Sequence, residues 1–299
     1  MQFESTASYL HRLAHAYRLT LPQLLDGLHI TTRGRPANNP GTGTTEIRLT
    51  PAAQQHLATF TRTPAERLAQ ALPRLSDTAP RPARARHHSV PATGPALAAW
   101  YPPDPDQQPV PSCPACTLRH TAGTTGHALA YLPDHLLHCP HHRYWSTRHH
   151  ALDVHTQPDL TTSQHHHRRL LRHPAGAASL TWAQTITTRW YDHQQHPALT
   201  RRWTKRLNQL TTTNPQAAAS RPSLTHLARQ AVTYPETITL ARHLAHARIT
   251  TTPTPHPKRH TDPATTHFLT HLAHHLHLTA LHPHTSDPLW NWIHHHTQR

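Results

Sequence analysis

Apolar residues recur at helical spacing through most of the chain, and short polar or proline-rich stretches interrupt them. In the N-terminal part the pattern predicts two pairs of short helices, over residues 5–28 and 50–75. Two helices joined by about four residues have the dimensions of a helix-turn-helix. Ordinary packing of a helical hairpin gives the same pattern, so the spacing alone leaves both interpretations open for each pair.

Helix-start signals support these pairs. Thr20 is followed three residues later by Gln23, which is the pattern of a capping box. Thr50 precedes a proline, a residue favoured at the first helical position. Thr63 repeats this signal before the second helix of the second pair, with Glu66 as the second half of another capping box.

The rest of the chain alternates between irregular and helical patterns. Residues 31–46 are rich in Gly, Pro, Thr and Asn and predict a loop, and residues 76–112 predict an extended Pro/Arg-rich connector. Helical periodicity returns after residue 146. The segment 223–246 is a third helix-turn-helix candidate, with its second helix expected to open at Tyr234-Pro235-Glu236.

These patterns predict a mainly α fold, with helix-turn-helix-like modules around a small zinc-knuckle domain that resembles a zinc ribbon and has little β structure. Residues 128–131, between the two halves of the knuckle, are a candidate short strand. The expected parts are an N-terminal helical region, the connector, a zinc module, a C-terminal helical domain, a linker and a last helical segment, over residues 1–75, 76–112, 113–145, 146–250, 251–263 and 264–299.

Charge and composition narrow the class of function. Lys and Arg number 29 against 14 Asp and Glu, so the formal net charge is +15, which favours a polyanionic partner such as double-stranded DNA. No apolar run is long enough to span a membrane, and the N-terminus lacks a signal-peptide pattern. We therefore expect a cytoplasmic, nucleoid-associated protein. The 36 histidines accompany many Arg and Pro residues and few Lys and Gly residues, as a GC-rich gene would give, so most are expected to be compositional.

All three cysteines lie in one short segment, at the spacing that metal-binding cysteines have. Cys113-Pro-Ala-Cys116 and Cys139-Pro-His-His142 share one spacing, with proline after the first ligand. Three thiolates and one imidazole are a common closed set for structural zinc. His142 matches the position of Cys116, so it is preferred to His141 or His138 as the fourth ligand. The alternatives are incidental free thiols or a catalytic cysteine.

Catalytic patterns are missing from the sequence. It has no HExxH motif, no glycine-rich phosphate loop and no serine nucleophile elbow. Histidine pairs at helical spacing are numerous, as expected by chance in so histidine-rich a chain. The prediction is a protein that is not an enzyme, and a metal hydrolase using histidine clusters is the least favoured alternative.

The order of motifs resembles the TniQ family, especially its actinobacterial members. The residues concerned are ESTASYLHRLAHAYRLTLPQLL at the N-terminus, LTPAAQQHLATFTRTPAERLAQAL, CPAC, and the second knuckle CPHH followed by Arg143-Tyr144-Trp145. The similarity is close over residues 1–145 and loose over 146–299. It implies a transposon DNA-targeting adaptor that recruits an AAA+ ATPase and a transposase, with Cys113, Cys116, Cys139 and His142 as zinc ligands. Many members carry a second cysteine pair after this site, which this chain lacks.

The predicted function is therefore a zinc-containing DNA-binding adaptor. A helix of the 50–75 or 223–246 pair would enter the major groove. The alternatives are a protein–protein scaffold and a DNA-binding protein of the transcription-regulator type, neither with a role in transposition. The candidate DNA contacts are Arg62, Arg67, Arg84, Arg86, Arg168, Arg169, Arg172, Arg201, Arg202, Lys205 and Arg206.

Overall fold

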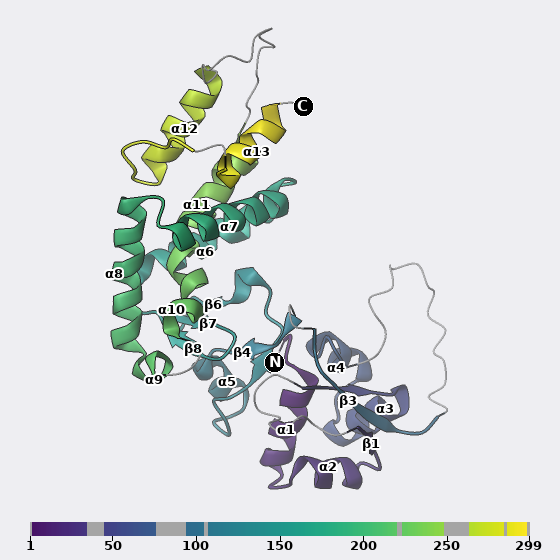
Figure 1. Cartoon of the computed structure of the whole chain (residues 1–299). Helices are drawn as coiled ribbons and strands as arrows, with labels where there is room; N and C mark the ends of the chain where they lie inside the picture. Colours follow the sequence, from purple (N-terminus) through teal and green to yellow (C-terminus); the bar gives the residue numbers. More distant parts are fainter. Residues whose placement is uncertain are drawn as a thin grey trace. The chain divides into compact units, whose positions relative to one another are not determined.

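The computed structural model describes residues 2–34, 45–75, 94–104, 107–219, 223–247, 263–283 and 286–297. The chain divides into two compact units, Met1–Leu152 and Asp153–Arg299. Helices predominate in both units, so the prediction of a mainly α fold is confirmed (Figure 1). None of the described helices is both long and apolar enough to cross a membrane.

The first unit begins with the two predicted helix pairs. They are α1 (Thr6–Ala16) with α2 (Leu21–Gly27), and α3 (Pro51–Thr61) with α4 (Ala65–Ala71). Thr20 and Gln23 form the predicted capping box, and Thr50 caps α3. The second predicted capping box was wrong. Pro64 is the residue that precedes α4, and no side chain caps it, because the Thr63 hydroxyl donates instead to Thr61 O at 3.2 Å.

A three-stranded sheet, missed by the sequence patterns, lies beside these helices. Its order is β1 (Thr31–Arg33), β3 (Leu97–Tyr101), β2 (Glu46–Leu49); β3 runs parallel to β1 and antiparallel to β2. The predicted loop over 31–46 and the predicted extended connector over 76–112 instead contribute strands in their described residues. Each strand is short and pairs with a segment that is distant in sequence. The local sequence therefore has no alternation of apolar and polar residues long enough to predict a strand. Leu10, Ile47 and Leu57 are fully buried in the shared core.

One carboxylate in this core is held by hydrogen bonds from three segments. Glu46 is fully buried, and its Oε1 accepts from the backbone N–H groups of Ala7 at 2.7 Å and Ile47 at 2.9 Å. The Tyr131 hydroxyl donates to Oε2 at 2.7 Å. Burial raises the pKa of Glu46, although all these hydrogen bonds favour the charged form. The carboxylate therefore ties α1, β2 and the segment after β5 together.

The remainder of the first unit is built from short elements. They are β4 (Val110–Pro111), α5 (Pro114–His120), β5 (Leu129–Ala130), the 3₁₀ turn η2 (Asp134–Leu136), β6 (His138–Cys139), β7 (Tyr144–Ser146) and β8 (Ala151–Asp153). The predicted short strand over 128–131 is confirmed as β5. The N-terminal segment pairs with it, since Ser5 N donates to Leu129 O at 2.8 Å and Tyr131 N to Phe3 O at 2.7 Å. The N-terminal helices and the cysteine region thus share one unit.

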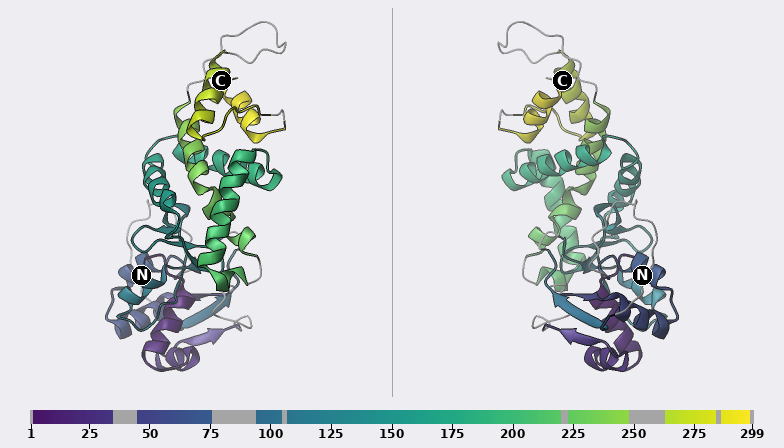
Figure 2. Two further views of the ribbon diagram at one scale, coloured as in Figure 1. Left: turned by 90° about the vertical axis from the view of Figure 1, so that its left-hand side faces the viewer. Right: turned by 90° about the vertical axis from the view of Figure 1, so that its right-hand side faces the viewer.

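Helices are the main elements of the second unit in its described residues. Its elements are α6 (Pro158–Leu170), α7 (Gly176–His193), α8 (Pro197–Thr213), α9 (Pro215–Ala218), α10 (Leu224–Leu227), α11 (Arg229–His246), α12 (Pro263–His275) and α13 (Pro288–Thr297). Helix α11 packs against α6, α7, α8 and α12 (Figure 1). Figure 2 shows α12 and α13 side by side, where the rings of Phe268 and Trp292 stack at 5.7 Å.

The third predicted helix-turn-helix, over 223–246, was wrong. Helix α10 is a single turn, and α11 begins directly after Ala228 and continues through Pro235. A proline inside a helix removes one hydrogen bond and costs about 3 kcal/mol. The cost is offset because α11 is buried on most sides, with Tyr234, Pro235 and Glu236 all inside the core. A helix buried in this way cannot enter a DNA groove.

The predicted linker over 251–263 lies outside the described residues, except Pro263, where α12 begins. The last segment, expected to be helical, contains α12 and α13.

Candidate metal centre and nucleic-acid interface

The three cysteines and one histidine converge in the first unit from two local structures. Cys113 is the residue that precedes α5, and Cys116 lies in the first turn of that helix, which Pro114 opens. Cys139 ends β6, and His142 lies in the turn that connects β6 to β7. Within that turn Arg143 has a positive φ of 54°, and its N–H donates to Cys139 O at 2.8 Å. A helix start and a tight strand turn therefore present two ligands each.

The distances fit a tetrahedral metal site. Metal–sulfur and metal–nitrogen bonds of zinc imply edges of about 3.8 Å between two sulfurs and about 3.6 Å between sulfur and nitrogen. The Sγ atoms of Cys116 and Cys139 lie 3.7 Å apart. The His142 Nδ1 lies 3.6, 3.2 and 3.7 Å from the Sγ atoms of Cys113, Cys116 and Cys139. Four ligand atoms with these edges can hold one metal ion.

The electrostatics of the group also favour a cation. A hydrogen bond with Cys113 lowers the pKa of Cys139 to about 4. The same hydrogen bond, together with burial, raises the pKa of Cys113, and burial raises that of Cys116. Three sulfurs this close repel one another when all are ionised, so without a metal only one thiolate is favoured. A divalent cation offsets the repulsion between the thiolates, so that all three cysteines can ionise.

The surrounding residues fix the ligands. The Thr117 hydroxyl donates to Cys113 O at 3.0 Å and holds the start of α5. His138 and Trp145 are buried partners across β6 and β7, with ring centroids 6.2 Å apart. His138 therefore belongs to the packing beneath the site. The histidine in the ligand group is His142, as the matched spacing of the two halves predicts.

The predicted DNA contacts fall into three groups. Arg84 and Arg86 lie outside the described residues. A second group has exposed side chains and is free to face solvent; it consists of Arg62, Arg67, Arg168, Arg169, Arg172, Arg201 and Lys205. The third group, Arg202 and Arg206, is partly buried in the second unit. Both guanidinium groups are engaged by other groups of this unit, so these two residues are not kept among the proposed phosphate contacts.

Arg206 joins three elements of that core. Its Nη1 donates to Glu236 Oε2 at 2.7 Å and to Val232 O at 2.8 Å, and its Nη2 to Asp159 Oδ2 at 2.6 Å. The Trp203 Nε1 also donates to Glu236 at 3.0 Å, and Arg202 lies 3.7 Å from the same carboxylate. Periodicity could not separate these residues from exposed Arg201, since all lie in one basic run on α8.

A basic hollow in the second unit gathers cations that the sequence patterns did not bring together. It has a volume of about 370 Å³, and none of its seven described lining residues is acidic. The residues come from α6, the turn after it and α11: His166, Arg169, Leu170, Arg172, His173, Arg242 and His246. The rings of His173 and His246 lie 4.7 Å apart, and Arg242 Nη1 lies 3.3 Å from His166 Nδ1.

Electrostatic repulsion is already apparent in this hollow. Burial lowers the pKa of His166, and the nearby charges of Arg242 and Arg169 lower it further. Of the lining residues, Arg169 and Arg172 were predicted as DNA contacts, whereas Arg242 and the histidines were missed. These residues come together only because α6 packs against α11. His166 and Arg242 are 76 positions apart in the chain, so no local sequence pattern could predict their contact.

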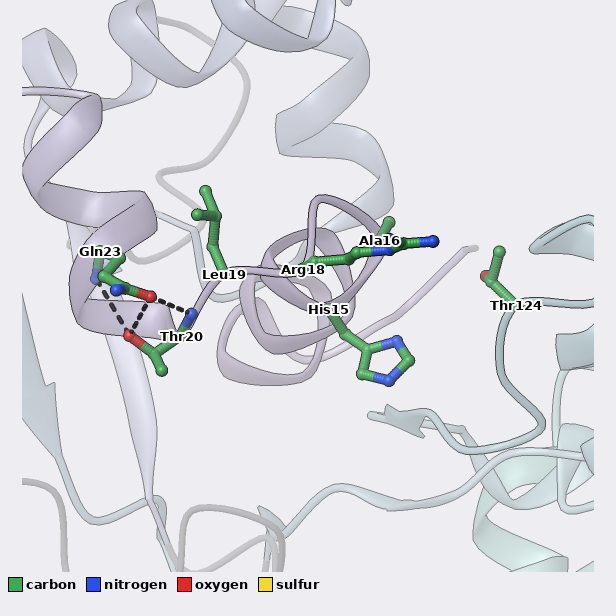
Figure 3. Close-up of a pocket in the computed structure, with 7 residues that line it drawn as sticks. All are labelled: His15, Ala16, Arg18, Leu19, Thr20, Gln23 and Thr124. Carbon is green, nitrogen blue, oxygen red and sulfur yellow. Dashed lines mark hydrogen bonds between the residues drawn. The ribbon is translucent and has the colours of Figure 1, made fainter.

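A second hollow, of about 580 Å³, lies in the first unit at the turn between α1 and α2. Figure 3 shows Thr20 and Gln23 joined by their capping hydrogen bonds, with Arg18 and Leu19 in the turn beside them. Tyr17, Leu19 and Phe60 are exposed apolar side chains, and the rings of Tyr17 and Phe60 lie 5.0 Å apart. Exposed apolar side chains therefore lie next to the turn between α1 and α2.

Comparison with known proteins identifies the first unit. A family model, described as TniQ, matches residues 1–145. Neither the search of curated proteins nor the search of solved structures finds a match for the chain. The matched residues contain α1 to α5 and all four ligands of the candidate metal centre. Residues 1–145, just under half of the chain, are therefore similar to the TniQ family.

Proposed function

We propose that the protein is a zinc-containing, DNA-binding adaptor of the TniQ type that acts in DNA transposition without catalysing a reaction itself. The observation that supports DNA binding most directly is the basic hollow between α6 and α11. The family match over residues 1–145 supports the transposition role. The net charge of +15 supports a polyanionic partner.

The metal of the cysteine site is proposed to be zinc. Thiolate and imidazole donors in a tetrahedral arrangement suit zinc better than magnesium or calcium, which prefer oxygen ligands. Cys113, Cys116, Cys139 and His142 fill all four positions, so no position is left for a substrate. When bound, the ion supplies folding energy by joining the start of α5 to the turn between β6 and β7.

DNA phosphates are proposed to enter the basic hollow. Arg169, Arg172 and Arg242 supply guanidinium groups that can bind phosphate oxygens bidentately. Arg169 and His246 lie in the last turns of α6 and α11, and Arg172 lies just beyond α6, where positive charge is favourable for the helix. The cluster is therefore tolerated in the free protein and gains a partner when a phosphate backbone is present.

In the first unit, α3 and α4 are the proposed site of groove contact. Three residues, Arg62 to Pro64, separate the two helices, which fits the length of a helix-turn-helix turn. Arg62 and Arg67 are exposed on this pair. Phosphate contacts fix the register of a protein on DNA, whereas contacts in a groove read the bases, so the two proposed surfaces have different roles.

The proposed protein partners are an AAA+ ATPase and a transposase, as the TniQ resemblance implies. The exposed aromatic surface around Tyr17, Leu19 and Phe60 supports instead a second candidate function, a protein–protein scaffold with weak DNA contact. Co-purification with an ATPase in the absence of any DNA complex would favour the scaffold. We propose a cytoplasmic, nucleoid-associated location. The DNA-binding adaptor, unlike the scaffold, is expected to co-purify with DNA.

The test is a titration of duplex DNA with the zinc-loaded protein at several salt concentrations. Several phosphate contacts give a steep fall of log affinity with log salt, of roughly 0.9 for each phosphate neutralised. We expect a slope of about −3 or steeper. A flat dependence, or no binding at low salt, would contradict the proposed function.

A further inference from the structure

A second group of metal-binding side chains lies in the helical unit. Within the part of the chain that the structure describes, two groups of three or more potential ligands converge. One is the cysteine centre. The other consists of His243 on α11 with His271 and His275 on α12, whose ligand atoms all lie within 4.8 Å of one another.

The three rings form a closed triangle. Their centroids lie 5.4 Å apart for His243 and His271, 4.6 Å for His243 and His275, and 4.6 Å for His271 and His275. Histidine pairs at helical spacing are common in this chain and have little weight alone. Convergence of three imidazoles from two helices is a separate observation, since it depends on how α11 and α12 pack.

The hydrogen bond of His243 prepares it for coordination. Its Nδ1 lies 2.8 Å from Thr239 O, so this nitrogen carries the proton and donates it to the carbonyl. The lone pair is therefore on Nε2. Histidines that bind metals usually donate their second ring N–H to a backbone carbonyl or a carboxylate in this way, which fixes both tautomer and ring orientation.

The pair on α12 has the spacing of a helical chelate. His271 and His275 are four residues apart, so they lie on one face of the helix. The same separation places two histidines on one zinc ion in helical metal sites. Both are exposed, so their side chains can rotate to bring the three nitrogens to the roughly 3.3 Å separations of a tetrahedral site.

We propose that His243, His271 and His275 form a second site for a divalent transition metal, with zinc as the physiological ion. Neutral imidazoles suit zinc, copper and nickel, whereas magnesium and calcium prefer oxygen donors. Three protein ligands leave the fourth position open for water or an external ligand. The site is independent of the DNA-binding proposal, because it uses none of the residues that line the basic hollow.

The bound ion would join α11 to α12. His243 and His271 are 28 positions apart, and the described contacts between these two helices are few beside those between α11 and α7. A ligand that binds only the folded arrangement stabilises it. Metal binding is therefore expected to fix the end of α12 against α11, near Arg242 of the basic hollow.

The experiment uses the full chain with one zinc in the cysteine site and weaker sites stripped by a moderate chelator. Titration with Co²⁺ is followed by visible absorption. Cobalt bound by the histidines gives d–d bands but no sulfur-to-metal charge-transfer band, which distinguishes it from cobalt at the cysteine site. The wild type should show one saturable equivalent. The double variant His271→Ala/His275→Ala should bind that equivalent at least 10-fold more weakly. His274→Ala, an exposed histidine of the same helix, is the matched control and should retain it.

The outcomes separate the proposal from adventitious binding. All variants should keep the one tightly held zinc, since the cysteine site is untouched, and both substituted histidines are exposed, so folding is preserved. A rise in absorption that never saturates and is equal in all variants would overturn the proposal. So would a saturable equivalent that survives in the double variant, or one that is lost equally in His274→Ala.

Discussion

The Sγ atoms of Cys116 and Cys139 lie 3.7 Å apart, although the two residues are 23 positions apart in the chain. This separation matches the edge of a tetrahedron around one metal ion. The two halves of the site are short local structures, a helix start and a strand turn. A metal ion bound by both halves would therefore contribute to the folding energy of the first unit.

Replacement of Cys139 by alanine is expected to unfold the region around α5, β6 and β7. Removal of one ligand leaves two thiolates and an imidazole, which bind zinc much more weakly. The variant should lose its zinc and melt at a lower temperature than the wild type. His141→Ala is the matched control, because His141 is an exposed neighbour outside the ligand group. A Cys139→Ala protein with unchanged zinc content and melting temperature would show that no metal holds this region.

Glu46 should impose a pH dependence on stability. Burial raises its pKa above the ordinary 4.5, so the folded state binds the proton more tightly than the unfolded state does. The contribution of Glu46 is therefore greatest below pH 4.5 and declines as the pH rises through the raised pKa. The free energy of unfolding of the wild type, relative to Glu46→Gln, should fall over this range. Parallel stability curves for the two proteins would contradict the raised pKa.

Glu46→Ala separates hydrogen bonding from charge at the same position. The change leaves the buried N–H groups of Ala7 and Ile47 without their acceptor, and each such loss costs about 1–3 kcal/mol. Glu46→Gln keeps one acceptor oxygen and should be destabilised less. Denaturant unfolding of both variants measures the difference; equal losses would mean that the hydrogen bonds contribute little.

Arg206→Ala should destabilise the second unit by about 3 kcal/mol. The substitution leaves the buried carboxylate of Glu236 without its nearest charged partner, which is the costly way to break a buried ion pair. Trp203 and Arg202 still contact Glu236, so the loss is placed at the lower end of the usual range. Arg201→Ala, exposed on the same helix, should change stability by less than about 0.5 kcal/mol. Similar losses for the two variants would refute the structural role of Arg206.

Gly176 opens α7 at a point where only glycine fits. A Cβ atom there would overlap the carbonyl oxygen of Leu170, the last residue of α6. Gly176→Ala should therefore cost more than about 3 kcal/mol, because backbone atoms have to move. Gly27→Ala is the control, since a Cβ at Gly27 meets nothing within 4 Å. Thermal unfolding of both variants tests this, and equal melting temperatures would contradict the close approach.

The sequence predicts features that depend on local spacing. The capping box of Thr20 and Gln23 and the matched halves around Cys113 and Cys139 are defined within a few residues, and the structure contains both. Strand β3 was missed because its partners β1 and β2 lie far away in the chain, and a five-residue strand of mostly small or aromatic residues has no alternation.

Residues on one helix can also have opposite roles that periodicity does not separate. Arg201 and Arg206 belong to the same basic run, yet one is exposed and the other lies against Glu236. Tyr234 and Pro235 have the pattern of a helix start, but burial keeps α11 continuous through them. The basic hollow and the three-histidine cluster depend on contacts of α11 with α6 and α12, which only the packed structure reveals.

The most direct measurement of the central claim is the salt dependence of DNA binding for matched arginine variants. Arg172, in the basic hollow, and Arg189, on α7 outside it, are both exposed. Arg172→Ala should make the slope of log affinity against log salt shallower by about 0.9, and the triple variant Arg169→Ala/Arg172→Ala/Arg242→Ala by about three times as much. Arg189→Ala should leave the slope unchanged. Equal slopes for the wild type and the triple variant would contradict the assignment of this hollow to DNA phosphates.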